Sequence, residues 1–261
     1  MLKIDMHVHS NHSFDGLMSV DDILRKVRKL GLDGVAIADH NSFAGSLEAM
    51  AKADGLIIIP AVEYSTDCGH MLAFFVCSDA KGILRQKNGK YNFFEVAKLV
   101  KSQGGLLFAA HPYKGRKNFP PEALHLVDGL EVFNSRCVVR HQTSNNMAQR
   151  KVQEAGKGFC AGSDAHTPKE LGNACRFFDL PPKAGLENIK KALAETSGSY
   201  FGKFSPLSCY CRSDLLARRK RDGFAGLVKG CLRFAAGLLI DAKYILSRQN
   251  KDLKTGKIYE I

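Results

Sequence analysis

The stretch LKIDMHVHS at residues 2–10 joins an apolar, strand-like run to two histidines near its end. His7 and His9 are two residues apart, so on an extended strand both imidazoles leave the same face and can bind one ion. The same combination of a buried strand and a metal-binding side chain recurs along the first two thirds of the chain. It is found in GVAIADH at 34–40, LIIIPAVE at 56–63, GLLFAAH at 105–111 and GFCAGSDAH at 158–166.

The strand-like runs alternate with helical patterns. VDDILRKVRKLG at 20–31 repeats apolar residues at helical spacing, with Ser19 as a cap and Gly31 as a stop. Alternating strands and helices indicate a largely parallel α/β sheet, and seven strands favour a closed barrel whose working face lies at the carboxyl ends of the strands. His70 opens its own strand, which leaves that strand either antiparallel to the others or at the rim. The predicted strands are 2–8, 34–38, 56–62, 71–77, 105–110, 129–133 and 158–162.

Nine side chains of metal-ligand type form the candidate site. Histidine together with carboxylate suits Zn, Mn or Fe, and a carboxylate such as Glu63 can bridge two ions. A single histidine outside this pattern, such as His125 or His141, is more often structural. The repeated placement at strand ends therefore predicts a multi-metal hydrolase. The nine residues are His7, His9, Asp15, His40, Glu63, His70, His111, Asp164 and His166.

These motifs, in this order, resemble the polymerase and histidinol phosphatase (PHP) family over about residues 1 to 180. The resemblance implies a distorted (β/α)7 barrel, two or three divalent ions and phosphoester hydrolysis, as in the small stand-alone phosphoesterases of the family. Phe14 departs from the pattern, because serine more often precedes the aspartate there, whereas Asp15 itself is kept. The matching motifs are His7-Val8-His9-Ser10, Asp15-Gly16, Asp39-His40, Glu63, His70, His111-Pro112 and Gly162-Ser163-Asp164-Ala165-His166.

The resemblance also implies a division of the ligands among three sites. The first site would contain His7, His9, Glu63 and Asp164. Glu63 would bridge to a second site with His70 and His111, and a hydroxide between these two ions would attack phosphorus. Asp15, His40 and His166 would hold a third ion, and Asp39 would fix the tautomer of a ligand. The catalytic residues expected from this scheme are His7, His9, Glu63, Asp164 and His166.

Cations beside the metals should bind the substrate phosphate. Arg136, which follows a strand, is the first candidate, and Lys114 and Arg116, which follow His111-Pro112, come next. Glu131 and Asn134 lie on the segment before Arg136 and are also candidates for the pocket wall, although strand alternation directs them to different faces.

The chain has a formal net charge of +12 at pH 7, which favours an anionic substrate. We expect phosphate esters of nucleotides, nucleoside bisphosphates or nucleic-acid ends. A phosphatase of small metabolites, of the histidinol-phosphate type, is the second reading. A non-catalytic metal-binding regulatory module is the third, but such a module should have lost ligands, and all nine are present.

Composition changes near residue 200 and divides the chain into a barrel at 1–202 and a basic extension at 203–261. The extension has 13 Lys or Arg against 5 Asp or Glu. Its apolar residues fall on one helical stripe, which favours a helix covering the barrel flank. Contact with an anionic membrane surface, a nucleic acid or a protein are the alternatives. The stripe contains Phe224, Leu227, Val228, Cys231, Ala235, Leu238, Leu239, Ala242 and Ile245.

The chain lacks an uncharged apolar run of about eighteen residues, so a transmembrane helix is not expected. It also lacks a secretory signal at its start, and we expect a cytoplasmic protein. Its eight cysteines are expected to be reduced thiols.

Overall fold

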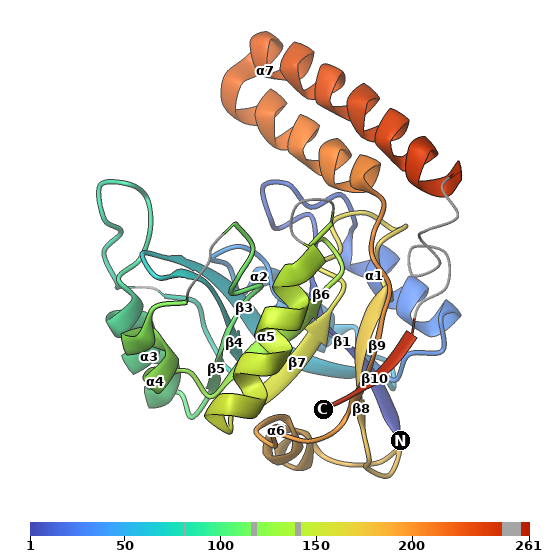
Figure 1. The fold of residues 1–261 in the computed structure, drawn as a ribbon. Coiled ribbons are helices and arrows are strands. Elements are labelled where there is room, and N and C mark those ends of the chain that lie inside the picture. Colours follow the sequence, from blue (N-terminus) through green and yellow to red (C-terminus); the bar gives the residue numbers. More distant parts are fainter. Residues whose placement is uncertain (81, 116–118, 139–141, 247–256) are drawn as a thin grey trace.

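Eight strands close into a barrel in the computed structural model of the protein, which describes residues 1–80, 82–115, 119–138, 142–246 and 257–261 (Figure 1). Strand β8 pairs with both β7 and β1 and thereby closes the sheet. The predicted α/β barrel is confirmed, and each predicted strand is present. The eight strands are β1 (Leu2–Val8), β2 (Gly34–Ile37), β3 (Ile57–Thr66), β4 (Gly69–Phe74), β5 (Leu106–Ala109), β6 (Gly129–Asn134), β7 (Gly158–Gly162) and β8 (Ala174–Phe178).

Strand β8 was not predicted, because its five residues ACRFF have the charged Arg176 at their centre. The structure buries this guanidinium at 2% exposure. Arg176 donates to the carbonyl oxygens of Phe159, Leu193 and Ala192 and lies over the Phe159 ring. Backbone carbonyls and an aromatic face replace the water that the charge loses, so a strand with a central arginine can close the barrel.

Two groups of parallel strands are separated by a reversed strand on each side, β4 between β3 and β5 and β8 between β7 and β1. Strands β1, β2 and β3 are parallel, as are β5, β6 and β7, whereas β4 is antiparallel to both neighbours. The start of β4 therefore lies at the end of the barrel where the parallel strands finish. His70, near that start, consequently reaches the same face as the ligands that follow the parallel strands, which settles the placement that the sequence left open.

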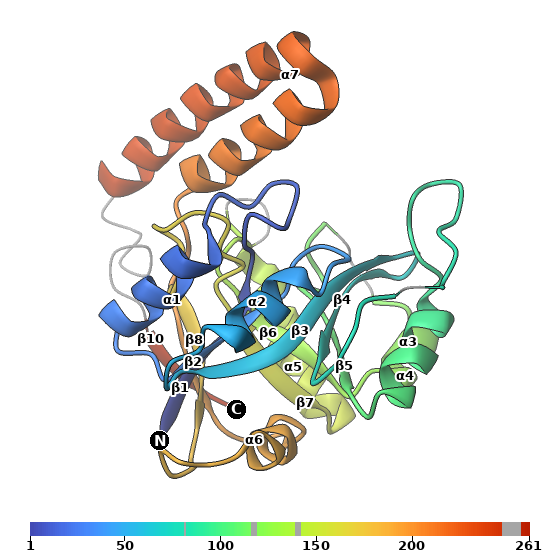
Figure 2. The ribbon, with the colours of Figure 1, turned by 180° about the vertical axis from the view of Figure 1, so that it is seen from behind.

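The helices lie outside the barrel (Figures 1 and 2). Helix α1 is capped as predicted, because Ser19 accepts from the backbone N–H of Asp22 at 3.1 Å, and Gly31 follows the helix at φ 65°. Helix α6 closes the end of the barrel opposite the ligand loops, where Ile189 and Leu193 join the core residues of the strands. The helices of this part are α1 (Val20–Lys29), α2 (Ala44–Ala51), α3 (Phe93–Ser102), α4 (Pro121–Leu126), α5 (Gln142–Ala155) and α6 (Leu186–Leu193).

The basic extension is joined to the barrel at both of its ends. Strand β9 (Ser199–Gly202) pairs with β8, and β10 (Lys257–Glu260) returns to pair with β9. Tyr259 of β10 stacks on Tyr200 of β9 with ring centroids 5.0 Å apart. The predicted boundary at 202/203 therefore coincides with the end of β9, but the chain beyond it contributes a strand to the same sheet.

Helix α7 (Leu207–Leu246) is a hairpin that projects above the barrel mouth (Figure 1). Gly223, at φ 61° and ψ −137°, bends it between a first arm, residues 207–222, and a second arm, residues 224–246. The predicted flank cover is wrong, because the apolar stripe of the second arm faces outward. Phe224 is 80% exposed and Leu239 73% exposed. Ile245 is in the helix, but its side chain lies outside the described residues.

Two further expectations concern this region and the thiols. By length and composition alone, the segment Leu207–Lys243 is suited to cross a membrane, contrary to the expectation from the sequence. The sequence criterion was an uncharged apolar run of about eighteen residues, and the most apolar part of this segment is interrupted by Lys229 and Arg233. All eight cysteines lie within the described residues, where none of them forms a disulfide.

Candidate metal centre

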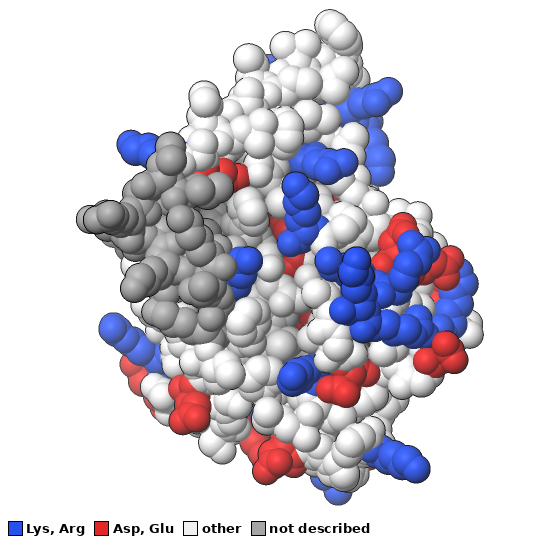
Figure 3. All heavy atoms as spheres, turned by 90° about the vertical axis from the view of Figure 1, so that its right-hand side faces the viewer, with Lys and Arg blue, Asp and Glu red and all other residues white. Residues whose placement is uncertain are grey.

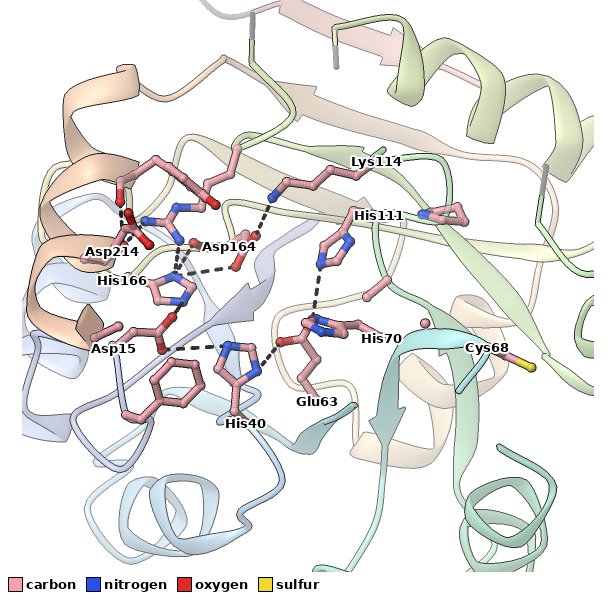
Figure 4. Close-up of a pocket in the computed structure, with 18 of the residues that line it drawn as sticks. Asp15, His40, Glu63, Cys68, His70, His111, Lys114, Asp164, His166 and Asp214 are labelled. Atoms are coloured by element: carbon pink, nitrogen blue, oxygen red, sulfur yellow. Dashed lines mark hydrogen bonds and ion pairs between the residues drawn. The ribbon is translucent and has the colours of Figure 1, made fainter. Parts of the chain in front are cut away.

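All nine predicted ligand-type side chains come together at the barrel mouth, although they are spread over 160 residues of sequence (Figure 4). Most of them line a cavity of about 440 Å³, while His7 and His9 lie buried at its base. They come from strand β1 and the loop after it, from the loops that follow β2, β5 and β7, from strand β3 and from the start of β4. The members on the cavity wall are Asp15, His40, Glu63, His70, His111, Asp164 and His166.

Four of the nine side chains present their donor atoms to one point. His7 Nε2 lies 3.0 Å from His9 Nε2, and His9 Nε2 lies 3.4 Å from Glu63 Oε2 and 3.3 Å from Asp164 Oδ1. His7 Nε2 is 3.7 Å from each of the two carboxylate oxygens. A tetrahedral ion with bonds of about 2.0–2.1 Å places its ligands about 3.3–3.4 Å apart. The spacing of this group therefore suits one divalent ion.

Glu63 connects this group to a second one. Its Oε2 atom faces His7 and His9, whereas its Oε1 atom lies 3.0 Å from His70 Nδ1 and 3.3 Å from His111 Nε2. A carboxylate whose two oxygens face separate sets of histidines has the arrangement of a bridging ligand. The geometry is that of the bridge expected from the sequence.

Asp15 organises the third group. Its Oδ2 atom lies 3.1 Å from His166 Nε2, and its Oδ1 atom lies 3.7 Å from His40 Nε2. His40 also turns Nδ1 toward Glu63 Oε2 at 2.8 Å, so it lies between the second and third groups instead of belonging to the third alone. The three groups form one continuous cluster.

The cluster contains buried polar atoms that the protein leaves without hydrogen bonds. They are Asp15 Oδ1, His40 Nδ1 and Glu63 Oε2. Buried polar atoms in folded proteins nearly always have a partner, because losing water without replacement costs about 1–3 kcal/mol. Carboxylate oxygens and an imidazole nitrogen that converge on a common space without hydrogen-bond geometry are the arrangement that a cation would satisfy. These residues therefore fit divalent ions.

The charges of the cluster depend on each other. Burial alone would raise the pKa of Glu63, but the imidazoles of His70, His40 and His7 hold that pKa well below its ordinary value. Burial would lower the pKa of His7, but the carboxylates of Glu131 and Asp164 outweigh burial and raise that pKa well above its ordinary value. A proton on His7 thus offsets the neighbouring carboxylates here, and a metal ion would take the place of that proton.

Two polar partners behind His7 and His9 set their tautomers. Glu131 Oε1 lies 2.9 Å from His7 Nδ1, and a carboxylate can only accept, so the Nδ1–H donates and Nε2 faces the cluster. Ser13 donates its single hydroxyl proton to Asp39 at 2.7 Å, so its oxygen accepts from His9 Nδ1–H at 3.1 Å. Asp39 therefore acts on a ligand tautomer as expected, but through Ser13.

Glu131 and Asn134 were expected on different faces of their strand, and this is wrong. The register of β6 against β7 shifts between Glu131 and Phe133, which is a bulge. Asn134 Nδ2 consequently donates to Glu131 Oε2 at 3.0 Å and to Asp164 Oδ2 at 3.2 Å. The bulge brings both residues behind the metal cluster, not into the pocket wall.

Unusual backbone positions hold parts of the site. His111 and Asp164 have positive φ angles of 30° and 53°. Residues other than glycine seldom adopt this backbone region. Strain of this kind costs of order 1–3 kcal/mol per residue and is concentrated at functional sites. Gly162 allows β7 to approach β1, because a Cβ atom there would lie 2.3 Å from His7 Cβ.

The three cations predicted for substrate binding have different surroundings. Arg136 lines the cavity, but its donors are engaged by Glu170 Oε1 at 2.7 Å, His166 Nδ1 at 2.9 Å and Ser213 Oγ at 2.6 Å. Its role is therefore to position neighbouring groups more than to bind phosphate. Lys114 also lines the cavity, with Nζ 3.8 Å from Asp164 Oδ2 and a side chain 20% exposed. Arg116 lies outside the described residues.

The first arm of α7 supplies a wall that sequence reasoning missed. Tyr210 lies beneath the charges of Lys114 and Arg136, at 5.6 and 5.0 Å from its ring centroid. Forty-four residues separate Tyr210 from His166, and no local pattern marks it. Glu170, four residues after His166, was also missed, since it looks like an ordinary loop carboxylate. The residues of the arm at the cavity are Tyr210, Ser213, Asp214, Ala217 and Arg221.

The sequence of this chain is similar to those of known proteins. An uncharacterized protein of Methanocaldococcus jannaschii is 31% identical over 180 residues, which cover 61% of this chain and 97% of that protein. The PHP domain matches residues 5–105, and the PHP-associated domain matches residues 142–195. The chain belongs to the PHP domain family. The resemblance noted in the sequence is confirmed, and the match to the PHP domain includes Asp15, His40, Glu63 and His70 of the cavity wall.

Shorter matches link this PHP protein to relatives with named activities. A probable histidinol-phosphatase of Thermotoga maritima is 48% identical over 40 residues, 15% of this chain and 17% of that protein. A 5'-3' exoribonuclease of Haemophilus influenzae is 37% identical over 67 residues, 25% of this chain and 24% of that protein. Among solved structures, a two-domain Bacteroides vulgatus protein containing a predicted PHP-like metal-dependent phosphoesterase aligns with a TM-score of 0.63. It is 18% identical and covers 88% of this chain and 70% of that chain.

Proposed function

We propose that this PHP protein is a metal-dependent phosphoesterase. The observation that carries the proposal is the cluster at the barrel mouth, in which Glu63 turns one oxygen toward His7 and His9 and the other toward His70 and His111. Such a carboxylate suits two neighbouring divalent ions. A third ion would be held by Asp15 and His166, and Zn, Mn and Fe all suit this mixture of ligands.

When bound, divalent ions supply a nucleophile from water at neutral pH and neutralise charge on phosphoryl oxygens. The protein's own contribution is to hold the ligands in place and to bind the substrate. Glu131 and Ser13 orient the imidazoles of His7 and His9, so that their Nε2 atoms stay directed at the cluster. Arg136, which is bonded to Glu170, lies 2.9 Å from His166 Nδ1.

Lys114 is the cation that we assign to the substrate phosphate. The Lys114 side chain is partly exposed at the cavity, with Nζ 3.8 Å from Asp164, whereas Arg136 is only 5% exposed and already contacts Glu170, His166 and Ser213. Because Asp164 is also a cluster residue, a phosphate bound by Lys114 would lie beside the ion group of His7 and His9. Figure 4 shows the Lys114 side chain reaching toward Asp164 across the cavity.

The aromatic side chains at the cavity favour a nucleotide substrate. Phe14 is 58% exposed and lies flat against His40, with ring centroids 5.2 Å apart and planes at 24°. Both Phe14 and Tyr210 line the cavity. Bases stack on exposed aromatic rings with about 1–3 kcal/mol per base. We therefore propose nucleotides, nucleoside bisphosphates or nucleic-acid ends as substrates.

A small-metabolite phosphatase is the second candidate. The cavity of about 440 Å³ accepts a compact phosphate ester, and one relative is a probable histidinol-phosphatase. In that case Phe14 would make no contact with the substrate. The two candidate functions therefore predict different effects of removing the Phe14 ring on substrate binding.

The test is a phosphate-release screen on protein loaded with Zn, Mn or Fe and analysed for metal content. Substrates are mononucleotides, nucleoside bisphosphates, short oligonucleotides, sugar phosphates and histidinol phosphate. We expect hydrolysis of at least one class by protein that holds at least two ions. Absence of phosphate release from every class, with two ions bound, would refute the phosphoesterase proposal.

Phe14→Ala separates the two substrate classes, with Phe94→Ala as its control. Phe94 is also exposed, at 52%, but lies on α3 away from the cavity lining. For a nucleotide substrate we expect Phe14→Ala to raise KM by about tenfold and Phe94→Ala to leave it unchanged. An unchanged nucleotide KM in Phe14→Ala would favour the small-metabolite reading.

A further inference from the structure

The outer face of the second arm of α7 is apolar and open to solvent. The side chains of Phe224, Leu239 and Leu232 are 80%, 73% and 69% exposed. Those of Val228 and Leu238 are nearly half exposed. With 100° per residue, these positions fall on one side of the helix, together with the small residues Ala235 and Ala242. Soluble proteins seldom expose large apolar side chains in such a continuous row.

The opposite face of this arm packs against the first arm through glycines. A Cβ atom at Gly226 would lie 2.3 Å from the Arg218 carbonyl oxygen, and one at Gly230 would lie 2.8 Å from Leu215 Cα. Asp241 reaches back to accept from the backbone N–H groups of Leu207 and Ser208 at 2.8 and 2.9 Å. The two arms therefore hold each other closely, and the apolar row is the face left over.

Positive charge lies along one edge of the apolar row. Residues 207–243 contain eight Lys or Arg and three Asp, a net charge of +5. Lys229 and Lys243 lie on the same edge of the row on the second arm, and Arg219 and Lys220 are exposed on the first arm. Figure 3 shows the hairpin at the top of the molecule as a mostly white surface with Lys and Arg beside and below it.

We propose that the outer face of the second arm of α7 binds the surface of an anionic lipid bilayer. An amphipathic helix with a basic border lies in the headgroup region, with its apolar side chains in the acyl boundary and its cations at anionic lipids. Phe224, Leu232 and Leu239 supply the apolar contact. Lys229 and Lys243 supply the electrostatic one.

The arm lies on the bilayer and does not cross it. Crossing would place Lys229 and Arg233 in the hydrocarbon, where each charge is expensive. Arg233 is also tied to the first arm through Asp214 at 3.2 Å. Detachment from the first arm would further expose the backbone at Gly226 and Gly230. A surface position keeps the hairpin intact.

Charge and apolar area together favour a lipid bilayer over a second copy of the chain or a nucleic acid. A second copy of the chain would bring together two hairpins that each carry a net charge of +5, and this repulsion opposes self-association. A nucleic acid would attract the cations but would leave the row from Phe224 to Leu239 exposed to water. An anionic bilayer satisfies both the charge and the apolar area.

Binding to lipid would also orient the barrel. The first arm lies between the second arm and the cavity, which it lines through Tyr210 and Ser213. One helix is about 10 Å thick, so the cavity mouth would lie about that distance from the headgroups. The substrate cavity would thus face the membrane side of the molecule.

The experiment is sedimentation of the full chain with vesicles of phosphatidylcholine, with and without phosphatidylglycerol. The variant is Phe224→Gln/Leu232→Gln/Leu239→Gln. Its matched control is Leu47→Gln/Leu84→Gln/Phe94→Gln, which removes three side chains that are 59%, 86% and 52% exposed elsewhere. All six positions are exposed, so both variants should fold, which circular dichroism checks.

We expect the wild type and the control to bind anionic vesicles, with weaker binding to neutral vesicles and in high salt. The outer-face variant should partition at least about tenfold less into anionic vesicles. Equal binding of the two variants, or failure of the wild type to bind vesicles, would overturn the proposal. A wild-type dimer in analytical ultracentrifugation that the outer-face variant converts to a monomer would assign the face to a second copy instead.

Discussion

The metal cluster and the second arm of α7 depart from ordinary burial in opposite directions. At the cluster, Glu63, His7 and His9 are fully buried although they are polar or charged, whereas on the arm Phe224 and Leu239 are exposed although they are apolar. Each arrangement costs free energy in the isolated chain, because buried charge loses water and exposed apolar surface orders it. Each becomes favourable once a partner is present.

The difference indicates what kind of partner each region takes. Converging lone pairs, such as those of His40 Nδ1 and Glu63 Oε2, need a compact cation. A row of apolar side chains with lysines at its edge needs an extended surface. The two regions should therefore respond to different treatments, and the following measurements test that separation.

Removal of divalent ions should have the largest effect. We expect a chelator to abolish phosphate release and to lower the melting temperature, because bound ions stabilise only the folded cluster. Sedimentation with anionic vesicles should be unchanged. After reconstitution, metal analysis should find at least two ions per chain. One ion or fewer would contradict the cluster, and loss of vesicle binding on chelation would contradict the independence of the hairpin.

Substitution of a single cluster residue should have the second largest effect. Asp164→Asn removes a charge that approaches His9 at 3.3 Å, and His9→Ala removes its partner. Each should lower kcat by more than about 100-fold, since even residues behind metal ligands are worth 10–100-fold. The control is His125→Ala, an exposed histidine on α4. Wild-type rates with unchanged metal content in the first two variants would show that these residues do not serve the chemistry.

Ser13→Ala tests the partner behind His9. Loss of the hydroxyl removes the acceptor of His9 Nδ1–H and one donor to Asp39. We expect metal affinity to fall by about 10–100-fold, measured by competition with a chelating dye, with the fold retained. Ser102→Ala, whose hydroxyl bonds only a helix carbonyl, is the control. Equal affinities in the two variants would remove Ser13 from the tautomer argument.

Tyr210→Ala changes the first arm of α7 where it lines the cavity of the metal cluster. Its effect on activity should be the smallest of the four. The ring lies beneath Lys114 and Arg136, and such cation–π contacts contribute about 0.5–2 kcal/mol. We expect KM to rise by about 2–10-fold with little change in kcat and none in metal content. Cys231→Ala, on the exposed side of the second arm, should leave KM unchanged. A fall in kcat with normal KM would mean that the first arm acts on the chemistry itself.

The sequence alone predicted the barrel and brought the ligand-type side chains to one end of it, for a physical reason. Parallel strands end at one edge, so His7, His40, His111 and Asp164, each near the end of a buried run, had to meet there. Their chemistry then followed from residue type. Strand β8 escaped prediction because the partners of Arg176 are carbonyl oxygens on other elements.

The sequence also contained the apolar stripe of the second arm but not its orientation. Periodicity shows that a helix has two faces, and it does not show which face packs inside the protein. That choice depends on short-range contacts, and Gly226 and Gly230 allow a closer approach than the larger apolar residues do. Only the folded chain showed that the glycine face packs and that the apolar face stays open.

Tertiary structure alone likewise decided what lies around the cluster. The bulge in β6 turns Glu131 and Asn134 to one side, and the return of β10 to β9 fixes the extension to the barrel, with the first arm of α7 at the mouth. These are contacts between residues far apart in the chain, and their existence depends on its whole path. Local sequence determines which side chains can bind an ion, whereas the path of the chain determines which partners orient them and which surface remains exposed.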